Sequence, residues 1–417
     1  MVALRYNRGM SFSLHPVAGD EFDRFARAEF AAFAEPLPAE EHPAWVTGEL
    51  DRTLAAFEGD EVVGTGRIYS LELTLPGGAV VPTAAVSAIG VLPTHRRRGI
   101  LTAIMRQQLD DAAARGESTA VLTASEGTIY RRFGYGAATA HASFDLDRRH
   151  SAFLPEVTIE GRCRLIDEED ARKALPEIFE RARRRQPGAI SRPDNWWPSQ
   201  YFVFHEARVG SGPPFHVVHE ATTGEIDGYV TYSVEHEHAH EIARDRLGVR
   251  DLVSTGASAR RALWCFVTGV DLVETITAWN VPADEPLRWM LRESRRMRLS
   301  SLHDHLWVRF VDVAAALAAR RYAVEGRIVV EVRDDFRPES GGRYRLTGGP
   351  DGAECTRTDA TADLACSTTE LASVYLGGVR ITDLARAGLV DELTAGALAR
   401  VDAMFAVDPL PFSQTWF

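Results

Sequence analysis

Cysteine is scarce in this sequence, and its four residues are too widely spread to form a dense disulfide framework. They are Cys163, Cys265, Cys355 and Cys366, with no CxxC pair among them. This usage fits a reducing, cytoplasmic setting. Long apolar runs are missing too: none approaches the ~18 uncharged residues of a membrane-spanning helix, and the first residues lack the apolar segment of a signal peptide. We therefore expect neither a membrane span nor secretion.

Basic residues are outnumbered by acidic ones, 47 against 59, which gives a net charge of -12. A field of this sign attracts cations and repels nucleic acid, so DNA and RNA are poor partners for this chain. Hydrophobic residues make up 45% of the sequence and charged residues 25%, which excludes a largely disordered protein. A globular protein with sizeable hydrophobic cores is expected.

The length of 417 residues predicts two to three domains, and we expect three. Segments rich in Val, Ile, Leu and Thr alternate with amphipathic segments of helical period, which predicts an α/β fold with mixed sheets. The alternation begins again after residue 155, and it changes to a polar hairpin and further helices after about residue 300. The expected domains are therefore 1–155, 156–300 and 301–417.

A basic loop in the first domain joins a predicted strand to a predicted helix. The runs EVVGTGRIYSLELTL and AAVSAIGVL, separated by the turn PGGAVVPT, predict a hairpin that feeds a central strand. After the loop PTHRRRG, apolar residues recur at helical spacing, and Gly116 stands where a helix C-cap is expected. Backbone N–H groups and the positive end of the helix dipole converge at such a junction, and three arginines add charged donors. The loop therefore predicts a diphosphate site, with a solvated basic turn as the simpler alternative.

Two commoner nucleotide motifs do not account for this loop. GxxxxGK[ST] is absent, so a P-loop nucleotidase is not expected. The run GYGAAT imitates GxGxxG, but it has Thr139 in place of the third glycine and follows no clear strand, so it does not predict a dinucleotide site.

The runs AAVSAIGVLPTHRRRGILTAIM and LTASEGTIYRRFGYG together resemble the coenzyme A site of the GCN5-related N-acetyltransferases (GNAT), in particular the Eis ("enhanced intracellular survival") family. Arg96 and Gly99 match the superfamily pattern (Arg/Gln)-x-x-Gly-x-(Gly/Ala), whereas Leu101 departs from its last position and suits the Eis branch. The resemblance covers the whole chain. It implies two tandem GNAT-like domains, the second without the basic loop, and then a domain similar to sterol carrier proteins. It also implies acetyl-CoA as co-substrate and a homo-oligomer, a hexamer built from dimers.

By matching motif positions, the resemblance implies a role for each residue of these runs. The pantetheine arm would pair with backbone at Ile89, Gly90 and Val91. The pyrophosphate would be held by Arg97, Arg98, Gly99, Ile100, Leu101 and Thr102, and the cofactor would lie beside Ser125 and Glu126. Tyr130 takes the place of the tyrosine that protonates the departing thiolate. A phenol, whose ordinary pKa is about 10, can donate that proton; without the motif, Tyr130 would be an ordinary core tyrosine.

The last ten residues, DPLPFSQTWF, carry Leu410, Phe412, Trp416 and Phe417. Large aromatics tend to be buried, and a carboxylate buried with them needs a partner or a role. The Eis resemblance implies that role: the terminal carboxylate of Phe417 would be the base, which is required because a lysine-like amine, with a pKa near ~10, is mostly protonated at pH 7. A tail docked only for stability is the alternative. Because Trp416 supplies no second acidic group, the acceptor stays open among aminoglycosides, polyamines and lysine side chains.

Two other functions are weighed against acetyl transfer. His236, His238 and His240 alternate along VEHEHAHE with a spacing that metal ligands use, but no cluster of acidic or Cys ligands completes a site, so no metal is expected. A non-catalytic CoA sensor or lipid carrier that uses residues 301–417 is the alternative function. That segment offers little apolar lining beyond LASVYLGGV and VDAMFAV.

Overall fold

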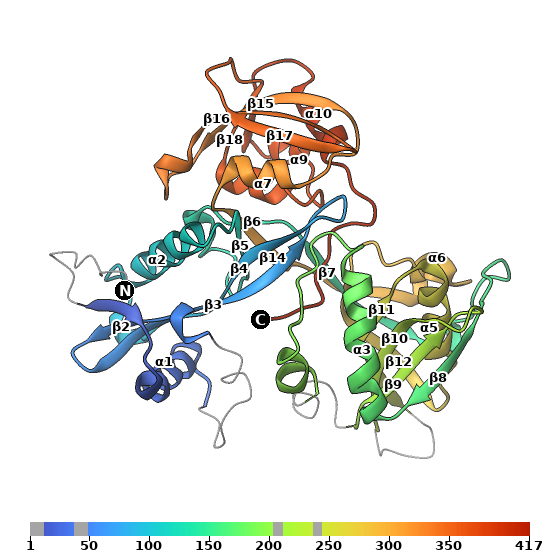
Figure 1. Cartoon of the computed structure of the whole chain (residues 1–417). Helices are drawn as coiled ribbons and strands as arrows, with labels where there is room; N and C mark the ends of the chain where they lie inside the picture. The colour runs from blue at the N-terminus through green and yellow to red at the C-terminus, as the bar shows by residue number, and fades with distance from the viewer. Residues whose placement is uncertain (1–11, 37–48, 203–211, 237–243) are drawn as a thin grey trace.

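A computed structural model of the chain describes residues 12–36, 49–202, 212–236 and 244–417. Figure 1 shows three units along the chain. The first is mostly blue and teal, the second mostly green and yellow, and the third mostly orange and red. The first two contain a seven-stranded sheet each, and the third contains a five-stranded sheet. The predicted α/β class with mixed sheets is confirmed, because each sheet has both parallel and antiparallel neighbours.

The first sheet has the strand order β1-β2-β3-β4-β5-β14-β6. Its strands are β1 (Ser13–Pro16), β2 (Thr53–Glu58), β3 (Glu61–Thr74), β4 (Val80–Val91), β5 (Thr119–Thr123), β6 (Gly136–Ala137) and β14 (Leu306–Phe310). The predicted hairpin is confirmed as the antiparallel pair β3–β4, and the predicted helix after the basic loop is α2 (Ile100–Ala114). Helix α2 crosses from β4 to the parallel strand β5.

Two helices cover opposite faces of this sheet, α1 (Phe22–Phe33) and α2. A Cβ on Gly64 of β3 would lie 2.5 Å from the Ile100 side chain of α2, whereas a Cβ on Gly90 of β4 would lie 2.7 Å from Ala32 of α1. Successive residues of a strand point to opposite faces, and Gly90 pairs with Thr65, the residue after Gly64. Glycine at these positions lets both helices approach the sheet closely.

The second sheet has the order β13-β7-β12-β11-β10-β9-β8. Its strands are β7 (Ala140–Asp147), β8 (Arg162–Ile166), β9 (Phe215–Glu220), β10 (Ile226–Glu235), β11 (Asp245–Ser254), β12 (Val273–Pro282) and β13 (Met297–Asp304), with helices α3 (Glu168–Arg183), α5 (Ala257–Gly269) and α6 (Leu287–Met290). Helix α5 crosses between the parallel strands β11 and β12, as α2 does in the first sheet. The buried face of α5 supplies Leu263 and Trp264 to the core of this unit.

The third sheet has the order β17-β16-β15-β18-β19. Its strands are β15 (Gly326–Arg333), β16 (Gly342–Gly349), β17 (Gly352–Arg357), β18 (Leu364–Ser367) and β19 (Val390–Glu392), with helices α7 (Val313–Ala319), α8 (Thr368–Val374), α9 (Ile381–Arg386) and α10 (Ala397–Phe405). The predicted polar hairpin is the pair β15–β16. One hydrophobic cluster joins this unit to the first sheet, since Phe310 of β14 packs edge-on against Tyr375, with 5.0 Å between ring centroids.

The first two sheets exchange strands, so their membership departs from the linear boundaries expected at 155/156 and 300/301. Strand β7 precedes residue 155 but pairs with β12 and β13 of the second sheet. Strand β14 follows residue 300 but pairs with β5 and β6 of the first sheet. The chain therefore passes from the first sheet to the second after β6 and returns after β13, a pairing between segments too distant for local sequence to reveal.

The described helices include none that is both long and apolar enough to cross a membrane. All four cysteines are free thiols.

Candidate active site

A cavity of about 860 Å³ opens beside the C-terminal half of β4. Strands β4 and β5 pair in parallel from Thr83–Thr119 to Ala85–Val121, and β4 continues to Val91 beyond them. The cavity lies where the two strands part, and α1, the basic loop, the first turn of α2 and the segment after β5 complete its walls. Its lining residues are Ala32, Phe33, Ile89, Gly90, Val91, His95, Arg96, Arg97, Gly99, Ile100, Leu101, Thr102, Ser125, Glu126, Ile129, Tyr130 and Arg132.

The basic loop enters α2 through a backbone conformation that suits glycine. Gly99 precedes the helix with φ +83°, and Arg97 has φ +64°. The first helical hydrogen bond runs from Ala103 N to Gly99 O, so the helix itself leaves the N–H groups of its first turn without acceptors. These N–H groups, the helix dipole and two arginine side chains bordering the cavity form a cradle for an anionic group.

The three arginines of the loop do not share one environment. Arg96 and Arg97 line the cavity, whereas Arg98 forms an ion pair with Glu58 of β2 at 2.6 Å. Hydrogen bonds from Arg98, and next from His95, hold the pKa of the Glu58 carboxyl below its usual range. The guanidinium of Arg98 thus joins the loop to β2.

Tyr130 lines the cavity and follows the segment that contains Ser125 and Glu126. The residue is 5% exposed, and its ring packs against Tyr135 with 6.1 Å between centroids. Burial raises the pKa of Tyr130 to about 12; the negative charge of Glu126 adds to the shift, and a hydrogen bond with Ser125 opposes it. The phenol therefore carries its proton throughout the neutral range.

The final segment of the chain threads between the first and second units, where Figure 1 marks the C-terminus. Phe412 is buried, and its backbone N–H donates to Pro187 O at 2.8 Å. The backbone oxygen of Trp416 accepts from Nε1 of Trp196 at 3.2 Å. Phe417 is half-buried against the cluster shared by the first and third units. The expected burial of this ending is therefore partial: Phe412 is buried, Trp416 and Phe417 are half-buried, and Leu410 is exposed.

Two histidines hold the ring of Trp416. His305, between β13 and β14, lies 4.4 Å from that ring, and His141 of β7 lies 6.0 Å from it, measured between ring centroids. His305 is buried, and among the described residues neither of its ring nitrogens has a hydrogen-bond partner. Burial, with a smaller contribution from His141, lowers the pKa of His305 to about 3. The ring is neutral at physiological pH and acts as part of an aromatic support for the end of the chain.

The structure brings together in this one cavity all of the residues that the sequence assigned to CoA binding and catalysis, except Arg98 and Phe417. Sequence reasoning missed Ala32 and Phe33, which α1 supplies from about 60 residues upstream, and also His95, Ile129 and Arg132. The last two lie within the quoted run around Tyr130 and could have been found there.

Of the three alternating histidines in VEHEHAHE, the structure describes only His236. His236 is paired with Asp245 at 2.7 Å, and His238 and His240 lie outside the described residues. In the part of the chain that the structure describes, no three His, Cys, Asp or Glu residues are grouped as metal ligands would be.

Comparison with known proteins gives matches along the chain. Residues 13–138 and 188–310 each match an acetyltransferase (GNAT) domain, and residues 313–414 match a sterol carrier protein domain. The N-acetyltransferase Eis of Mycobacterium tuberculosis is 36% identical over 91% of this chain and 92% of its own length. An uncharacterised N-acetyltransferase of Streptomyces coelicolor is 39% identical over 94% of this chain and 96% of its own. The crystal structure of Eis1 from Mycobacterium abscessus superposes with a TM-score of 0.87 and 38% identity, covering 97% of this chain and 100% of Eis1.

Proposed function

This chain belongs to the Eis family of GNAT N-acetyltransferases, and from that premise we propose that it transfers the acetyl group of acetyl-CoA directly to a primary amine. The acceptor is of the aminoglycoside, polyamine or lysine type. The observation that carries the proposal is the single cavity that joins the basic loop, the free edge of β4 and Tyr130.

The residues of the cavity fit acetyl-CoA as a substrate. Its diphosphate matches the anion cradle at the start of α2, with Arg97 as a charged donor and backbone N–H groups from Gly99 to Thr102. Its pantetheine amides match the backbone of Ile89, Gly90 and Val91, because this part of β4 extends beyond its pairing with β5. Acetyl-CoA supplies an activated thioester, so the protein has to place the amine and assist the departure of the sulfur.

Tyr130 is the general acid of this proposal. A buried phenol with a pKa of about 12 stays protonated until the thiolate develops. Complete transfer of its proton to a thiolate, whose conjugate thiol has an ordinary pKa of about 8.5, is unfavourable by roughly 3.5 pKa units, or ~5 kcal/mol. Tyr130 therefore acts by donating a hydrogen bond to the departing sulfur, which stabilises the negative charge that develops there as the carbon–sulfur bond breaks.

The α-carboxylate of Phe417 is the proposed base. The reaction must remove a proton from a cationic amine, and a negative charge beside that amine attracts and orients it. The contacts of Phe412 and Trp416 with the second unit, and of Phe417 with the shared cluster, support a fixed position for this end of the chain. The net charge of -12 favours cationic acceptors of all three classes.

The alternative of a non-catalytic CoA sensor or lipid carrier does not fit a member of an N-acetyltransferase family. As a further part of the proposal, the chain assembles into a symmetric homo-oligomer, a hexamer of the Eis type. Light scattering at micromolar concentration tests that assembly, and a monomeric mass would contradict it.

The test of the mechanism uses thiol release from acetyl-CoA with kanamycin, spermidine and Nα-acetyl-lysine as acceptors. A C-terminal extension turns the carboxylate of Phe417 into a neutral amide, and an N-terminal extension of the same residues serves as the control. We expect the C-terminal extension to lower turnover at least about 10²-fold, the usual order for a positioned acid or base, with CoA affinity retained. If the C-terminally and N-terminally extended proteins have the same turnover within threefold, the tail has only a structural role.

A further inference from the structure

The segment that follows Tyr130 is contacted along much of its length by the third unit. A 3₁₀ turn, Arg131–Phe133, comes directly after Tyr130, and Phe133 N donates back to Tyr130 O at 3.0 Å. Thr369 of α8 donates from Oγ1 to Arg131 O at 3.3 Å. Phe336, after β15, packs edge-on against Phe133 with 5.0 Å between ring centroids. The third unit thus touches both ends of the turn that presents the proposed acid.

Two glycines of the same segment leave no space between it and α8. A Cβ on Gly134 would lie 2.7 Å from Cγ2 of Thr368, and a Cβ on Gly136 would lie 2.1 Å from the backbone oxygen of Thr369. At Gly136 the neighbouring atom belongs to the backbone, so this contact cannot adjust by a change of rotamer. The segment from Arg131 to Gly136 and the start of α8 therefore keep one position relative to each other.

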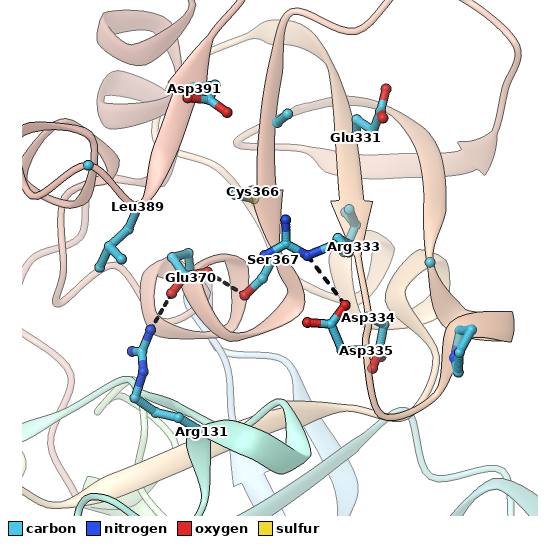
Figure 2. Close-up of a pocket in the computed structure, with 15 residues that line it drawn as sticks. Arg131, Glu331, Arg333, Asp334, Asp335, Cys366, Ser367, Glu370, Leu389 and Asp391 are labelled. Carbon is cyan, nitrogen blue, oxygen red and sulfur yellow. Dashed lines mark hydrogen bonds and ion pairs between the residues drawn. The ribbon is translucent and has the colours of Figure 1, made fainter.

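An ion pair completes the contact. Arg131 donates from its guanidinium to Oε1 of Glu370 at 2.6 Å, and Oε2 of Glu370 accepts from Ser367 Oγ. Figure 2 shows both interactions in the wall of a cavity of about 780 Å³ lined by the first and third units. The side chain of Glu370 is 5% exposed and that of Arg131 is 48% exposed. A carboxylate so buried needs its partner, so the pair fixes Arg131 more firmly than an exposed pair does.

We propose that Glu370 is a positioning residue for acetyl transfer, acting through Arg131 on the orientation of Tyr130. The proposal rests on the role of Tyr130 as acid given above. A phenol that must reach a departing sulfur depends on placement, because a displacement of about 1 Å can cost up to two orders of magnitude in rate. The third unit then contributes to catalysis twice, through the C-terminal segment and through the turn that presents Tyr130.

The test is steady-state kinetics of the full chain with acetyl-CoA and whichever of kanamycin, spermidine or Nα-acetyl-lysine gives the highest turnover. We expect Glu370→Gln and Arg131→Gln each to lower kcat about tenfold, with the KM for acetyl-CoA unchanged within twofold. The double variant is no slower than either single one, since both remove the same contact. Arg131→Lys keeps the charge and recovers most of the lost kcat. Asp335→Asn, which removes an exposed partner of Arg333 in the same cavity wall, is the matched control and leaves kcat unchanged.

A Tyr130→Phe background separates this proposal from its premise. If Glu370 acts through Tyr130, adding Glu370→Gln to Tyr130→Phe produces no further loss. A full additional tenfold loss there, or single variants with kcat within twofold of the unsubstituted chain, would overturn the positioning role while leaving the acid in place. A Tyr130→Phe chain with unchanged kcat would overturn both. Arg131→Gln changes a half-exposed side chain, so it keeps the test valid if Glu370→Gln fails to fold.

Discussion

Acid should destabilise this protein through one buried histidine, His305. Its pKa is about 3 in the folded chain, against about 6.5 for an exposed histidine. A group whose folded pKa is depressed contributes stability that is present above the unfolded pKa and is lost as the pH falls toward the folded pKa. At pH 5, about 1.5 pH units below the unfolded pKa, the histidine is protonated in the unfolded chain but not in the folded one. The free energy of unfolding is therefore ~2 kcal/mol lower at pH 5 than at pH 7.

The perturbation that isolates this effect is His305→Phe. Phenylalanine keeps a ring against Trp416 and removes the titration, and it discards no hydrogen bond of the ring, since the described residues provide none. The neighbouring groups that titrate or carry charge are His141, whose pKa burial also lowers, His303 and Asp304. Replacing His303, which is exposed, by Phe is therefore the matched control.

Thermal unfolding at pH 7 and pH 5 is the assay. For domains of about 150 residues, a change of ~2 kcal/mol in the free energy of unfolding shifts the Tm by roughly 4–8 °C. Between pH 7 and pH 5, the Tm of the unsubstituted chain and of the His303→Phe control should therefore fall by roughly 4–8 °C more than the Tm of His305→Phe does. If the decrease in Tm between pH 7 and pH 5 is the same within about 1 °C for all three proteins, the reasoning is refuted, because His305 would then titrate alike in the folded and unfolded chain.

Three further predictions concern the site. Arg97→Ala should weaken CoA binding about tenfold, measured by calorimetry, because one charge-assisted contact is lost. Arg98→Ala should weaken CoA binding less than threefold, because the side chain of Arg98 pairs with Glu58. Equal effects would contradict the placement of these two side chains. Tyr130→Phe should lower turnover about 10²- to 10⁴-fold with CoA affinity retained. Because the pKa of Tyr130 is about 12, its deprotonation should not lower the rate of the unsubstituted chain below about pH 11. A fall in rate near pH 9 would exclude Tyr130 as the acid. Gly136→Ala should lower the Tm by several degrees, because its Cβ would lie 2.1 Å from the backbone of α8. Gly127→Ala should be tolerated, because the nearest atom to its Cβ would be 3.8 Å away. Equal Tm values for the two variants would show that α8 can move aside.

The basic loop could be located from sequence because its parts are neighbours in the chain. Strand, arginines, Gly99 and the amphipathic helix follow one another within about 30 residues, and each has a local signal in periodicity or backbone preference. Tyr130 lies in the next run, so the family resemblance could place it as well. The exposed ion pair of Arg98 could not be foreseen, since Glu58 lies 40 residues away on a strand whose neighbours only the sheet determines.

The sequence by itself determined the class of the fold, the order of three units and the local frame of the cavity, because hydrophobic period, turn residues and motif spacing act over short distances along the chain. Only the tertiary structure decided that β14 returns to the first sheet, that α1 closes the cavity with Ala32 and Phe33, and that α8 reaches the turn after Tyr130. These contacts join residues up to 239 positions apart. They depend on which strand edges and apolar faces remain to be covered once the local elements have formed, and no short stretch of sequence records that choice.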